Sequence, residues 1–545
     1  MDEHPTVAHR VVEALRLTGV DTLYCLPGVQ NDDFFDVLVD ATDIAPVVAR
    51  HEQGTAYMAL GAAQVTGRPA ACSVVPGPGL LNAAAGLSSA YWGNARVLAV
   101  VGEIPTFARG KGFGLLHELP DQHAVVGQVT KHATVLEDGT TATAELQRAI
   151  DELVSGRPRP VGVEVPVNRW QAAAPGELRA PRASVPAVDA DAVDRAAEAI
   201  RRAERPLVVV GGGAQDAGDQ VRALAELLQA PVTTRRMGHG VIPTAHPLFA
   251  PLAVGHRYWA EADLVIGIGT RLEWPLMQWG TDDRMTIVKI DVDPDELDRH
   301  GVGTIGVVGD AAAACDALLT ALDGMPQRPD ATDEVARRRD EYRAAIDHLR
   351  PQLDILSAIR DVLPDDGVLV EDVTQVGFAA HLAFDFRRPR TFSSTGPAGT
   401  LGAGYAQGLG AQHALQAEGR KALVVAGDGG FLFTGSELAT AVQHGIPLVC
   451  AVFEDGAYGN VKRIQQQRFG PDRTIASTLH NPDFVEYARS FGALGLRAES
   501  PDQLRPCLEQ AFAADRPAIV HVEVGEMPDP WPWFLLGRVR GQRSS

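Results

Sequence analysis

The 545-residue chain lacks three features that would assign it to large classes of protein. Its five cysteines are scattered and none forms a CxxC pair, so the sequence predicts reduced, mostly buried thiols rather than a disulfide framework. No uninterrupted apolar run is long enough to cross a membrane, and the first five residues are not typical of a signal peptide. Positive charge is also scarce, because 49 Lys and Arg stand against 69 Asp and Glu, a formal charge of −20. These absences favour a cytoplasmic protein that binds neither nucleic acid nor a membrane.

What the chain does have is length and a regular alternation of short apolar strands with amphipathic helices. At 545 residues it is too long for one core, so about three domains are expected. In the first part we predict strands at 22–25, 45–48, 70–75 and 97–102 and helices at 7–17, 32–39, 54–65 and 79–91. This alternation is typical of a doubly wound parallel sheet. We therefore predict an α/β fold of three doubly wound parallel-sheet domains, at residues 1–172, 188–327 and 350–526, with a C-terminal tail at 527–545.

Two segments of the chain each allow two interpretations, a binding role and a packing role. The central domain begins with an apolar strand that runs into three glycines, Gly211–Gly213. Such a turn can approach a nucleotide, but glycine-rich turns after strands are common, so a packing role is at least as plausible. The proline-rich segment 527–534 is not expected to form a helix, and it either caps a site or packs over a core face.

The most informative motif is the run Gly427-Asp428-Gly429-Gly430, followed roughly two dozen residues later by the acidic pair Glu454-Asp455. The run closes a predicted strand at 421–426, the pair ends a second strand at 447–453, and a helix is predicted from Ser436 to His444. Because strand ends in one parallel sheet meet at one edge, Asp428 and Asp455 are expected a few ångströms apart. Carboxylate oxygens beside glycine N–H groups suit Mg²⁺ bridging a diphosphate, although Gly and Asp also favour an ordinary turn.

Three separated motifs resemble those of the acetolactate-synthase-like enzymes that depend on thiamine diphosphate (ThDP). Arg50–Ala56 with Val75–Gly79 is similar to their pyrimidine-binding domain, Thr395–Gly402 to the loop that cradles the aminopyrimidine, and Gly427–Asp455 to their diphosphate-binding motif. The resemblance covers the whole chain, in the order pyrimidine-binding, central and diphosphate-binding domain. It implies a ThDP- and Mg²⁺-dependent enzyme that forms a homodimer or a dimer of dimers, with each active site between subunits.

The resemblance also implies roles for individual residues. Glu52 matches the family glutamate that hydrogen-bonds N1′ of the pyrimidine and promotes loss of the cofactor's C2 proton, a role that requires shielding from water. The alternative is that Glu52 only offsets the dipole of the helix that it begins. Leu401 matches the apolar residue that wedges between the two cofactor rings, and Asp428, Asp455 and the Ala457 carbonyl match the Mg²⁺ ligands. The remaining implied cofactor contacts are Thr374, Gln375, Gly399, Gly427, Gly429, Gly430, Gly459 and Asn460.

Several positions depart from the family pattern. Glu454 replaces an asparagine and adds negative charge near the diphosphate, which weakens cofactor binding unless Glu454 points away or finds a cation. Ile464 stands where acetolactate synthases carry the tryptophan that shapes their acceptor site, which argues against that particular reaction. Residues 269–274 replace the run that helps those synthases hold FAD, so FAD is not expected.

Substrate-side candidates lie in the first domain. Gln30 and Asn31 follow the first strand, where ThDP decarboxylases place substrate-facing residues. Gln30 can hydrogen-bond a carboxylate or carbonyl, whereas Asn31 is predicted to N-cap the helix that begins at Asp32. His117 stands where acetolactate synthases have a glutamine, and a proton-shuttling role and a structural role stay equally open. We therefore place Glu52, His117 and Gln30 in the catalytic set.

The leading hypothesis is decarboxylation of a 2-oxoacid, after which the activated aldehyde is released or transferred to a carbonyl acceptor. One alternative is a 2-hydroxyacyl-CoA lyase or oxalyl-CoA decarboxylase, to which residues 269–274 bear some likeness. A Lys/Arg cluster for the CoA 3′-phosphate would favour that alternative, and none is evident. The other is a non-catalytic ThDP-fold regulatory subunit, but such a subunit has no need for Glu52 and Asp428, and both are present.

Overall fold

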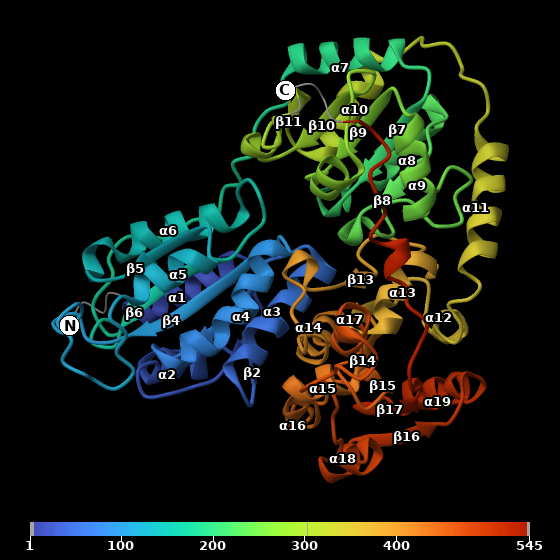
Figure 1. The fold of residues 1–545 in the computed structure, drawn as a ribbon. Coiled ribbons are helices and arrows are strands. Elements are labelled where there is room, and N and C mark those ends of the chain that lie inside the picture. Colours follow the sequence, from blue (N-terminus) through green and yellow to red (C-terminus); the bar gives the residue numbers. More distant parts are fainter. Residues whose placement is uncertain (1–4, 302, 542–545) are drawn as a thin grey trace. The chain divides into compact units, whose positions relative to one another are not determined.

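Three parallel sheets, each accompanied by helices, follow one another along the chain. The computed structural model describes residues 5–301 and 303–541, and Figure 1 shows its helices and strands. The predicted α/β fold with three parallel-sheet domains is confirmed. Contacts divide the chain into two compact units: the first comprises Met1–Ser184, Val368–Thr374 and Ser393–Gly525, and the second comprises Val185–Gly367, Gln375–Phe392 and Glu526–Ser545.

The first sheet has six parallel strands in the order β2-β1-β3-β4-β6-β5. Its strands are β1 (Thr22–Cys25), β2 (Ala45–Val48), β3 (Ala70–Val74), β4 (Val97–Glu103), β5 (His132–Val135) and β6 (Val161–Pro166). Its helices are α1 (Val7–Leu17), α2 (Asp32–Asp40), α3 (Glu52–Thr66), α4 (Pro78–Trp92), α5 (Gln122–Val129) and α6 (Gly139–Val154). The predicted strands and helices of this region are confirmed to within two residues at each end.

The third sheet has the strand order β13-β12-β14-β15-β17-β16. Its strands are β12 (Val368–Glu371), β13 (Phe392–Ser393), β14 (Ala422–Gly427), β15 (Val449–Glu454), β16 (Leu494–Ala498) and β17 (Ala518–Glu523). Its helices are α14 (Gly404–Gln416), α15 (Asp428–Thr434), α16 (Leu438–Gln443), α17 (Gly459–Phe469), α18 (Phe484–Ser490) and α19 (Pro501–Ala513). Helix α13 (Gln375–Ala383), which follows β12 in the chain, belongs to the second unit. Counted from its own start, this sheet repeats the strand order of the first.

The shared order makes elements of the two sheets equivalent. In each sheet the third strand runs into a glycine turn and a helix: β3 into Val75–Gly79 and α4, and β14 into Gly427–Gly430 and α15. The helix after the second strand is α3 in one sheet and α14 in the other. Ligand sites of open α/β sheets lie at the carboxyl ends of the strands, so both glycine turns occupy positions suited to binding.

Helices α3 and α14 pack against each other at two glycines within the first unit. A Cβ at Gly61 would collide with the carbonyl oxygen of Gln407, and one at Gly410 with the carbonyl of Met58. Most of α3 is buried, and a continuous apolar core joins residues of both sheets. The two predicted cofactor-binding domains therefore share one core.

The second unit holds the central sheet, with the strand order β11-β10-β9-β7-β8. Its strands are β7 (Pro206–Val210), β8 (Val232–Thr234), β9 (Leu264–Ile268), β10 (Thr286–Asp291) and β11 (Ile305–Val308), and its helices α7 (Ala190–Arg202), α8 (Gly218–Leu228), α9 (Leu252–Glu261), α10 (Ala311–Ala321), α11 (Thr332–Ile346) and α12 (Gln352–Val362). In the predicted glycine turn, Gly213 donates its N–H to the Gly269 carbonyl at 3.0 Å, so the glycines permit close backbone packing there. In the tail, Trp531 contacts Phe378 and Trp533 contacts Tyr342, so this segment packs on other aromatic side chains.

The helix predicted at 436–444 is confirmed as α16 to within two residues at each end. Helix α15, which starts at Asp428 and is joined to α16 by a short 3₁₀ turn at Gly435–Glu437, was not predicted. The low helix propensity of Gly429 and Gly430 masks its start in the sequence. Strands β5, β6, β11, β13, β16 and β17 were not predicted either. Within the described ranges, no helix is long and apolar enough to cross a membrane.

Candidate active site

The glycine turn after β3 lies between two predicted site residues. Gly77 has φ +60°, and a Cβ there would collide with the backbone carbonyl of His117. Its N–H donates to Oε1 of Gln122 at 3.0 Å, which anchors the turn. A Cβ at Gly79 would lie 3.6 Å from Oε1 of Glu52. The turn thus brings Glu52 and His117, which lie 65 positions apart in the sequence, to one edge of the sheet.

Glu52 is the first residue of α3 and is half-buried. His51 caps the helix, because its Nδ1 accepts the N–H of Gln53 at 3.2 Å. Asn82 on α4 donates its amide to Oε2 of Glu52 at 2.9 Å. Asn82 was not predicted, since no sequence pattern links it to Glu52. The carboxylate is therefore held through Oε2, while Oε1 faces the glycine turn.

Gln30 and His117 meet beside the same turn. Gln30 is buried, and its Nε2 lies 3.5 Å from the Leu116 carbonyl oxygen. Its Oε1 is buried without a hydrogen-bond partner among the described residues, and so is Nδ1 of His117. His117 also has φ +68°, a conformation that non-glycine residues seldom adopt. Two buried polar atoms that lack partners at one place are typical of a site that holds a ligand.

The prediction that Asn31 caps α2 is wrong in its mechanism. Asn31 occupies the cap position, but its side chain makes no capping hydrogen bond. Instead Nδ2 donates to the Val74 carbonyl at 3.0 Å, and the residue is fully buried against Gly102. Asn31 therefore ties the start of α2 to the end of β3, and two aspartates in the first turn are left to offset the helix dipole.

At the third sheet, Asp428 follows β14 and is 2% exposed. Its Oδ1 accepts the N–H of Gly429 at 2.9 Å, and its Oδ2 accepts the N–H of Gly456 at 3.0 Å. Burial raises the pKa of this carboxyl above its usual range, and the charge of Glu454 adds to the rise. A buried carboxylate that keeps its charge at neutral pH needs a nearby cation or further donors.

Asp455 lies beside Asp428 because β14 and β15 are paired, with Gly427 opposite Phe453. Burial raises the pKa of Asp455 to about 6, and the repulsion of Asp428 is the next cause. Oδ1 accepts the N–H of Ala457 at 3.1 Å, while Oδ2 lies where any side chain at position 459 would have to sit. Gly459 is therefore required by the placement of the Asp455 carboxylate.

The acidic residue that raised a doubt, Glu454, has two partners. Its Oε2 lies 2.6 Å from Nε2 of His521, and its Oε1 accepts the side-chain amide of Asn481 at 2.8 Å. Both oxygens of Glu454 are thus engaged, one by an imidazole and one by an amide. Asn481 and His521 were both missed, because they lie 27 and 67 positions further along the chain.

A third carboxyl at this edge, Asp372, was also missed. It directly follows β12, is 2% exposed, and accepts the N–H of Gly402 at 2.9 Å and of Val373 at 2.7 Å through Oδ1. Its Oδ2 is buried and has no hydrogen-bond partner within residues 5–301 and 303–541. Burial outweighs these hydrogen bonds and raises the pKa of Asp372 to about 6. Oδ2 lies 2.9 Å from where a Cβ of Gly430 would stand, so only glycine fits there.

Of the remaining predicted cofactor contacts, Leu401, Thr374 and Gly429 lie near Asp372 or Asp428. Cδ1 of Leu401 lies 3.2 Å from the same Gly430 position, and Gly399 has φ +58° in the loop before it. Oγ1 of Thr374 lies 3.6 Å from where a Cβ of Gly427 would stand. Gly429 faces the Tyr458 ring, while Asn460 follows in the first turn of α17. Gln375 belongs to the second unit, where it begins α13.

A buried glutamate connects the two halves of the first unit. Glu437 is fully buried and accepts the backbone N–H groups of Arg50 and His51 at 3.0 Å. Nearby, the Gln53 side chain donates to the Phe433 carbonyl at 3.1 Å. The start of α3, which carries Glu52, is therefore fastened to the segment that follows Asp428.

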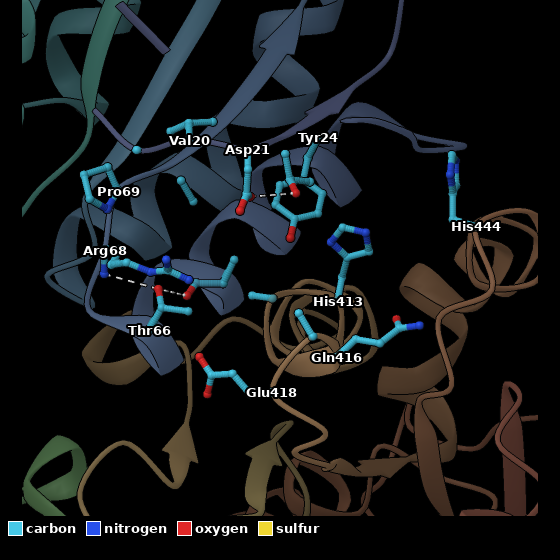
Figure 2. A pocket seen from close by; sticks show the side chains of 16 residues that line it. Val20, Asp21, Tyr24, Thr66, Arg68, Pro69, His413, Gln416, Glu418 and His444 are labelled. Atoms are coloured by element: carbon cyan, nitrogen blue, oxygen red, sulfur yellow. Dashed lines mark hydrogen bonds between the residues drawn. The ribbon is translucent and has the colours of Figure 1, made fainter. Parts of the chain in front are cut away.

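The cavity in Figure 2 lies away from these residues. It has a volume of about 620 Å³ and is lined by Asp21, Tyr24 and Arg68 of the first domain and by His413 and Glu418 near the end of α14. Thr22 and Ala70, which also line it, begin β1 and β3. The cavity is thus at the opposite edge of the sheet from the glycine turn, and it contains none of the predicted site residues.

Comparison with known proteins gives the family. Three models of the thiamine pyrophosphate (TPP) enzymes match the chain: the N-terminal TPP binding domain over residues 5–125, the central domain over 193–318, and the C-terminal TPP binding domain over 372–522. The chain therefore belongs to the thiamine-pyrophosphate-dependent enzyme family, and the resemblance seen in the sequence is confirmed. Thiamine pyrophosphate is another name for ThDP.

Relatives of known name cover nearly the whole chain. A probable 2-ketoarginine decarboxylase of Pseudomonas aeruginosa is 34% identical in an alignment of 531 positions that covers 93% of this chain and 92% of the relative. Acetolactate synthase isozyme 2 large subunit of Escherichia coli is 29% identical in an alignment of 559 positions, gaps included, that covers 96% of each chain. A probable acetolactate synthase large subunit of Methanocaldococcus jannaschii is 28% identical in an alignment of 560 positions that covers 95% of this chain and 91% of the relative.

Proposed function

We propose that the protein catalyses ThDP- and Mg²⁺-dependent decarboxylation of a 2-oxoacid in the cytoplasm, and that the aldehyde is released or passed to a carbonyl acceptor. The observation that carries the proposal is the pair of neighbouring carboxylates at the buried Asp428 and the half-buried Asp455. They are close enough that their repulsion contributes to raising the pKa of Asp455 to about 6. A divalent cation removes this repulsion, and carboxylate oxygens are the ligands that Mg²⁺ prefers.

The residues around this pair fit the cofactor's diphosphate. Gly429 and Gly430 have no room for side chains, because Tyr458 and Leu479 lie against the first and Asp372 and Leu401 against the second. Glycine-rich turns of this kind are typical of sites where backbone N–H groups bind an anion. We assign Asp428, Asp455 and the Ala457 carbonyl to Mg²⁺. To the cofactor itself we assign Thr374, Gln375, Gly399, Leu401, Gly427, Gly429, Gly430, Gly459 and Asn460. When bound, ThDP supplies an electron sink, because its thiazolium ring accepts the electron pair left when CO₂ departs.

We assign Glu52 to the proton transfer that activates the cofactor. Asn82 holds Oε2 of Glu52 at 2.9 Å, which leaves Oε1 to hold or release a proton. The glycine turn bars side chains from the space next to Oε1. The fastening of residues 50 and 51 by Glu437 keeps the start of α3 in place while the proton moves. The carboxyl is therefore oriented before a substrate arrives.

On the substrate side, Gln30 and His117 are the candidates. The partnerless Oε1 of Gln30 and Nδ1 of His117 are both available to a bound 2-oxoacid or its product. Ile464, at the position of the acceptor-site tryptophan of acetolactate synthases, is 44% exposed. We infer that release of an aldehyde is favoured over acetolactate formation, in line with the relative named as a probable 2-ketoarginine decarboxylase.

The test supplies the purified protein with ThDP, Mg²⁺ and a panel of 2-oxoacids that begins with pyruvate and 2-ketoarginine. CO₂ release and product identity are followed together. Free aldehyde supports a decarboxylase, and a ligated hydroxyketone supports a carboligase. If ThDP binds but no 2-oxoacid turns over, the proposal is wrong, and acyl-CoA substrates or a binding-only subunit take its place.

The proposal includes a homodimer or a dimer of dimers, and a mixing experiment tests where the active site lies. In the structure the pyrimidine-binding and diphosphate-binding halves pack within one chain. Inactive Glu52→Gln and Asp428→Ala proteins are dissociated, mixed and reassembled. If each site takes Glu52 and Asp428 from different subunits, mixed dimers regain one intact site and activity returns. If both come from one chain, the mixture stays inactive, and light scattering reports the oligomer size in either case.

A further inference from the structure

Glu454, which precedes the predicted Mg²⁺ ligand Asp455, departs from the family pattern. Both of its carboxylate oxygens accept hydrogen bonds. Oε2 lies 2.6 Å from Nε2 of His521, and Oε1 accepts from Nδ2 of Asn481 at 2.8 Å. Because a carboxylate only accepts, Nε2 of His521 carries the donated proton. His521 stands on β17, is 2% exposed, and packs on the Phe484 ring with the ring centres 5.3 Å apart. Glu454 is thus fixed from the interior side.

The side chain of Asn481 joins this pair to the predicted metal ligand. Its Nδ2 also donates to Oδ2 of Asp428, at 2.7 Å. An amide nitrogen has two hydrogens, so one points to each carboxylate and neither is left over. The position of Asn481 is therefore determined by Glu454 on one side and Asp428 on the other.

The two oxygens of Asp428 are consequently unequal. Oδ2 accepts from both Asn481 at 2.7 Å and the N–H of Gly456 at 3.0 Å, so its lone pairs are engaged. Oδ1 accepts from the N–H of Gly429 at 2.9 Å and keeps a second lone pair. A cation that approaches this carboxylate meets Oδ1.

We propose that Asn481, anchored by the Glu454–His521 pair, is a positioning residue that turns Oδ1 of Asp428 toward Mg²⁺. The inference rests on the proposed function, because the cation belongs to it. Groups that hydrogen-bond a metal ligand fix its orientation, and their loss lowers metal affinity about 10- to 100-fold. Glu454 therefore supports the predicted metal ligand through hydrogen bonds, although it carries a negative charge itself.

Two substitutions separate geometry from charge. Asn481→Ala removes both amide hydrogen bonds, so Mg²⁺ binding is expected to weaken about 10- to 100-fold. Glu454→Gln removes only the negative charge: its carbonyl still accepts from Asn481, and its amino group donates to Nε2 of His521 once that proton moves to Nδ1. Since Nδ1 of His521 makes no hydrogen bond to any residue that the structure describes, this exchange breaks no other hydrogen bond there. Glu454→Gln is expected to bind Mg²⁺ nearly as the wild type does.

Glu454→Ala and a matched control complete the set. Glu454→Ala removes the hydrogen bonds to both Asn481 and His521, so its Mg²⁺ affinity should fall as it does in Asn481→Ala. It also carries the test if circular dichroism shows that Asn481→Ala is unfolded. The control is Glu226→Gln, which alters another carboxylate–imidazole pair, with His246 at 3.1 Å, in the central unit. It should leave Mg²⁺ binding unchanged.

The experiment titrates Mg²⁺ by calorimetry into each metal-free protein at saturating ThDP, and then measures turnover against Mg²⁺ concentration. In Asn481→Ala, raised Mg²⁺ should restore turnover with an unchanged KM for the 2-oxoacid, which a general loss of stability would not produce. Wild-type affinity in Asn481→Ala, or equal losses in Glu454→Gln and Glu454→Ala, would overturn the inference. If the wild type itself binds no Mg²⁺ with ThDP, the proposed function fails, and this inference fails with it.

Discussion

The carboxyl edges of the first and third sheets are built on the same strand order and carry opposite chemistry. The first presents the half-buried Glu52 beside a glycine turn, with Gln30 and His117 nearby, each of which has a buried polar atom without a hydrogen-bond partner among the described residues. The third presents Asp428 and Asp455 together with Asp372, and burial raises the pKa of each. The carboxyl edge of the first sheet is suited to transferring a proton. That of the third sheet is suited to binding a cation together with an anion.

The difference shows that topology fixes where a site can form, while a few turn residues decide its chemistry. After the third strand of each sheet comes a glycine turn, but one reads Pro76-Gly77-Pro78-Gly79 and the other Gly427-Asp428-Gly429-Gly430. The first turn excludes side chains from the space between Glu52 and His117. The second adds a carboxylate at the start of α15, where the free N–H groups of a helix favour negative charge.

The largest expected effect is the loss of the acidic edge. Asp428→Ala removes the carboxylate around which Gly429, Gly456 and Asn481 converge. We expect Asp428→Ala to lose Mg²⁺-dependent ThDP retention, as measured by calorimetry. The control Asp502→Ala, at an exposed residue, should retain both Mg²⁺ and ThDP. Unchanged cofactor affinity in Asp428→Ala would show that the two edges are not specialised in this way.

The matching change at the first edge should separate binding from chemistry. Glu52→Gln keeps the shape of the side chain and its contact with Asn82 but removes the exchangeable charge. We expect ThDP to bind normally and turnover to fall about 10²- to 10⁴-fold, the range for loss of a general acid–base group. The C2–H exchange of bound ThDP, followed by NMR, should be lost. Wild-type exchange in this variant contradicts the assignment.

A pH series on the metal-free protein sharpens the contrast. The pKa of Asp372 is raised to about 6 from an ordinary 3.8, so the folded protein binds more protons than the unfolded one between these values. The free energy of unfolding therefore falls as the pH rises from about 4 to about 6, by up to about 3 kcal/mol from this group. Asp372→Asn should remove that part of the slope and leave the part due to Asp455. Denaturant unfolding at several pH values measures it, and parallel slopes in both proteins would refute the prediction.

The smallest expected effect concerns the packing of α3 against α14, which joins the two halves of the first unit. Gly61→Ala or Gly410→Ala places a methyl group against a backbone carbonyl of the facing helix. We expect each to cost about 1–3 kcal/mol of stability, as overpacked cores do. Gly127→Ala is the control, because a Cβ there meets nothing within 4 Å, and it should be neutral or slightly stabilising. Thermal unfolding gives the midpoint temperature of each of the three variants. Equal midpoints would mean that close packing of α3 against α14 does not contribute to stability.

Much of this arrangement could be predicted from the sequence, because strand and helix patterns are local. The strands and helices of the first domain, the glycine turns and the acidic pair all leave signals within a few residues. Asn481 and His521 do not, since their contacts with Glu454 arise only when β15, β17 and the loop after α17 fold together. Asp372 reads as the end of an ordinary strand, and only its burial shows that it is unusual. Asn31 misled for the same reason, because its long-range contact with Val74 replaced the local cap.

The packing of α3 against α14 has a consequence for how the chain is made. Residues from 67 to 403 separate the two helices, and they include the whole central sheet. On a ribosome that adds about 5–20 residues per second, α3 emerges on the order of tens of seconds before α14 exists. During that interval its apolar surface has no partner from the same chain. The nascent protein thus passes through an intermediate with exposed apolar surface. Slower translation of the codons for the central sheet should increase its dependence on chaperones.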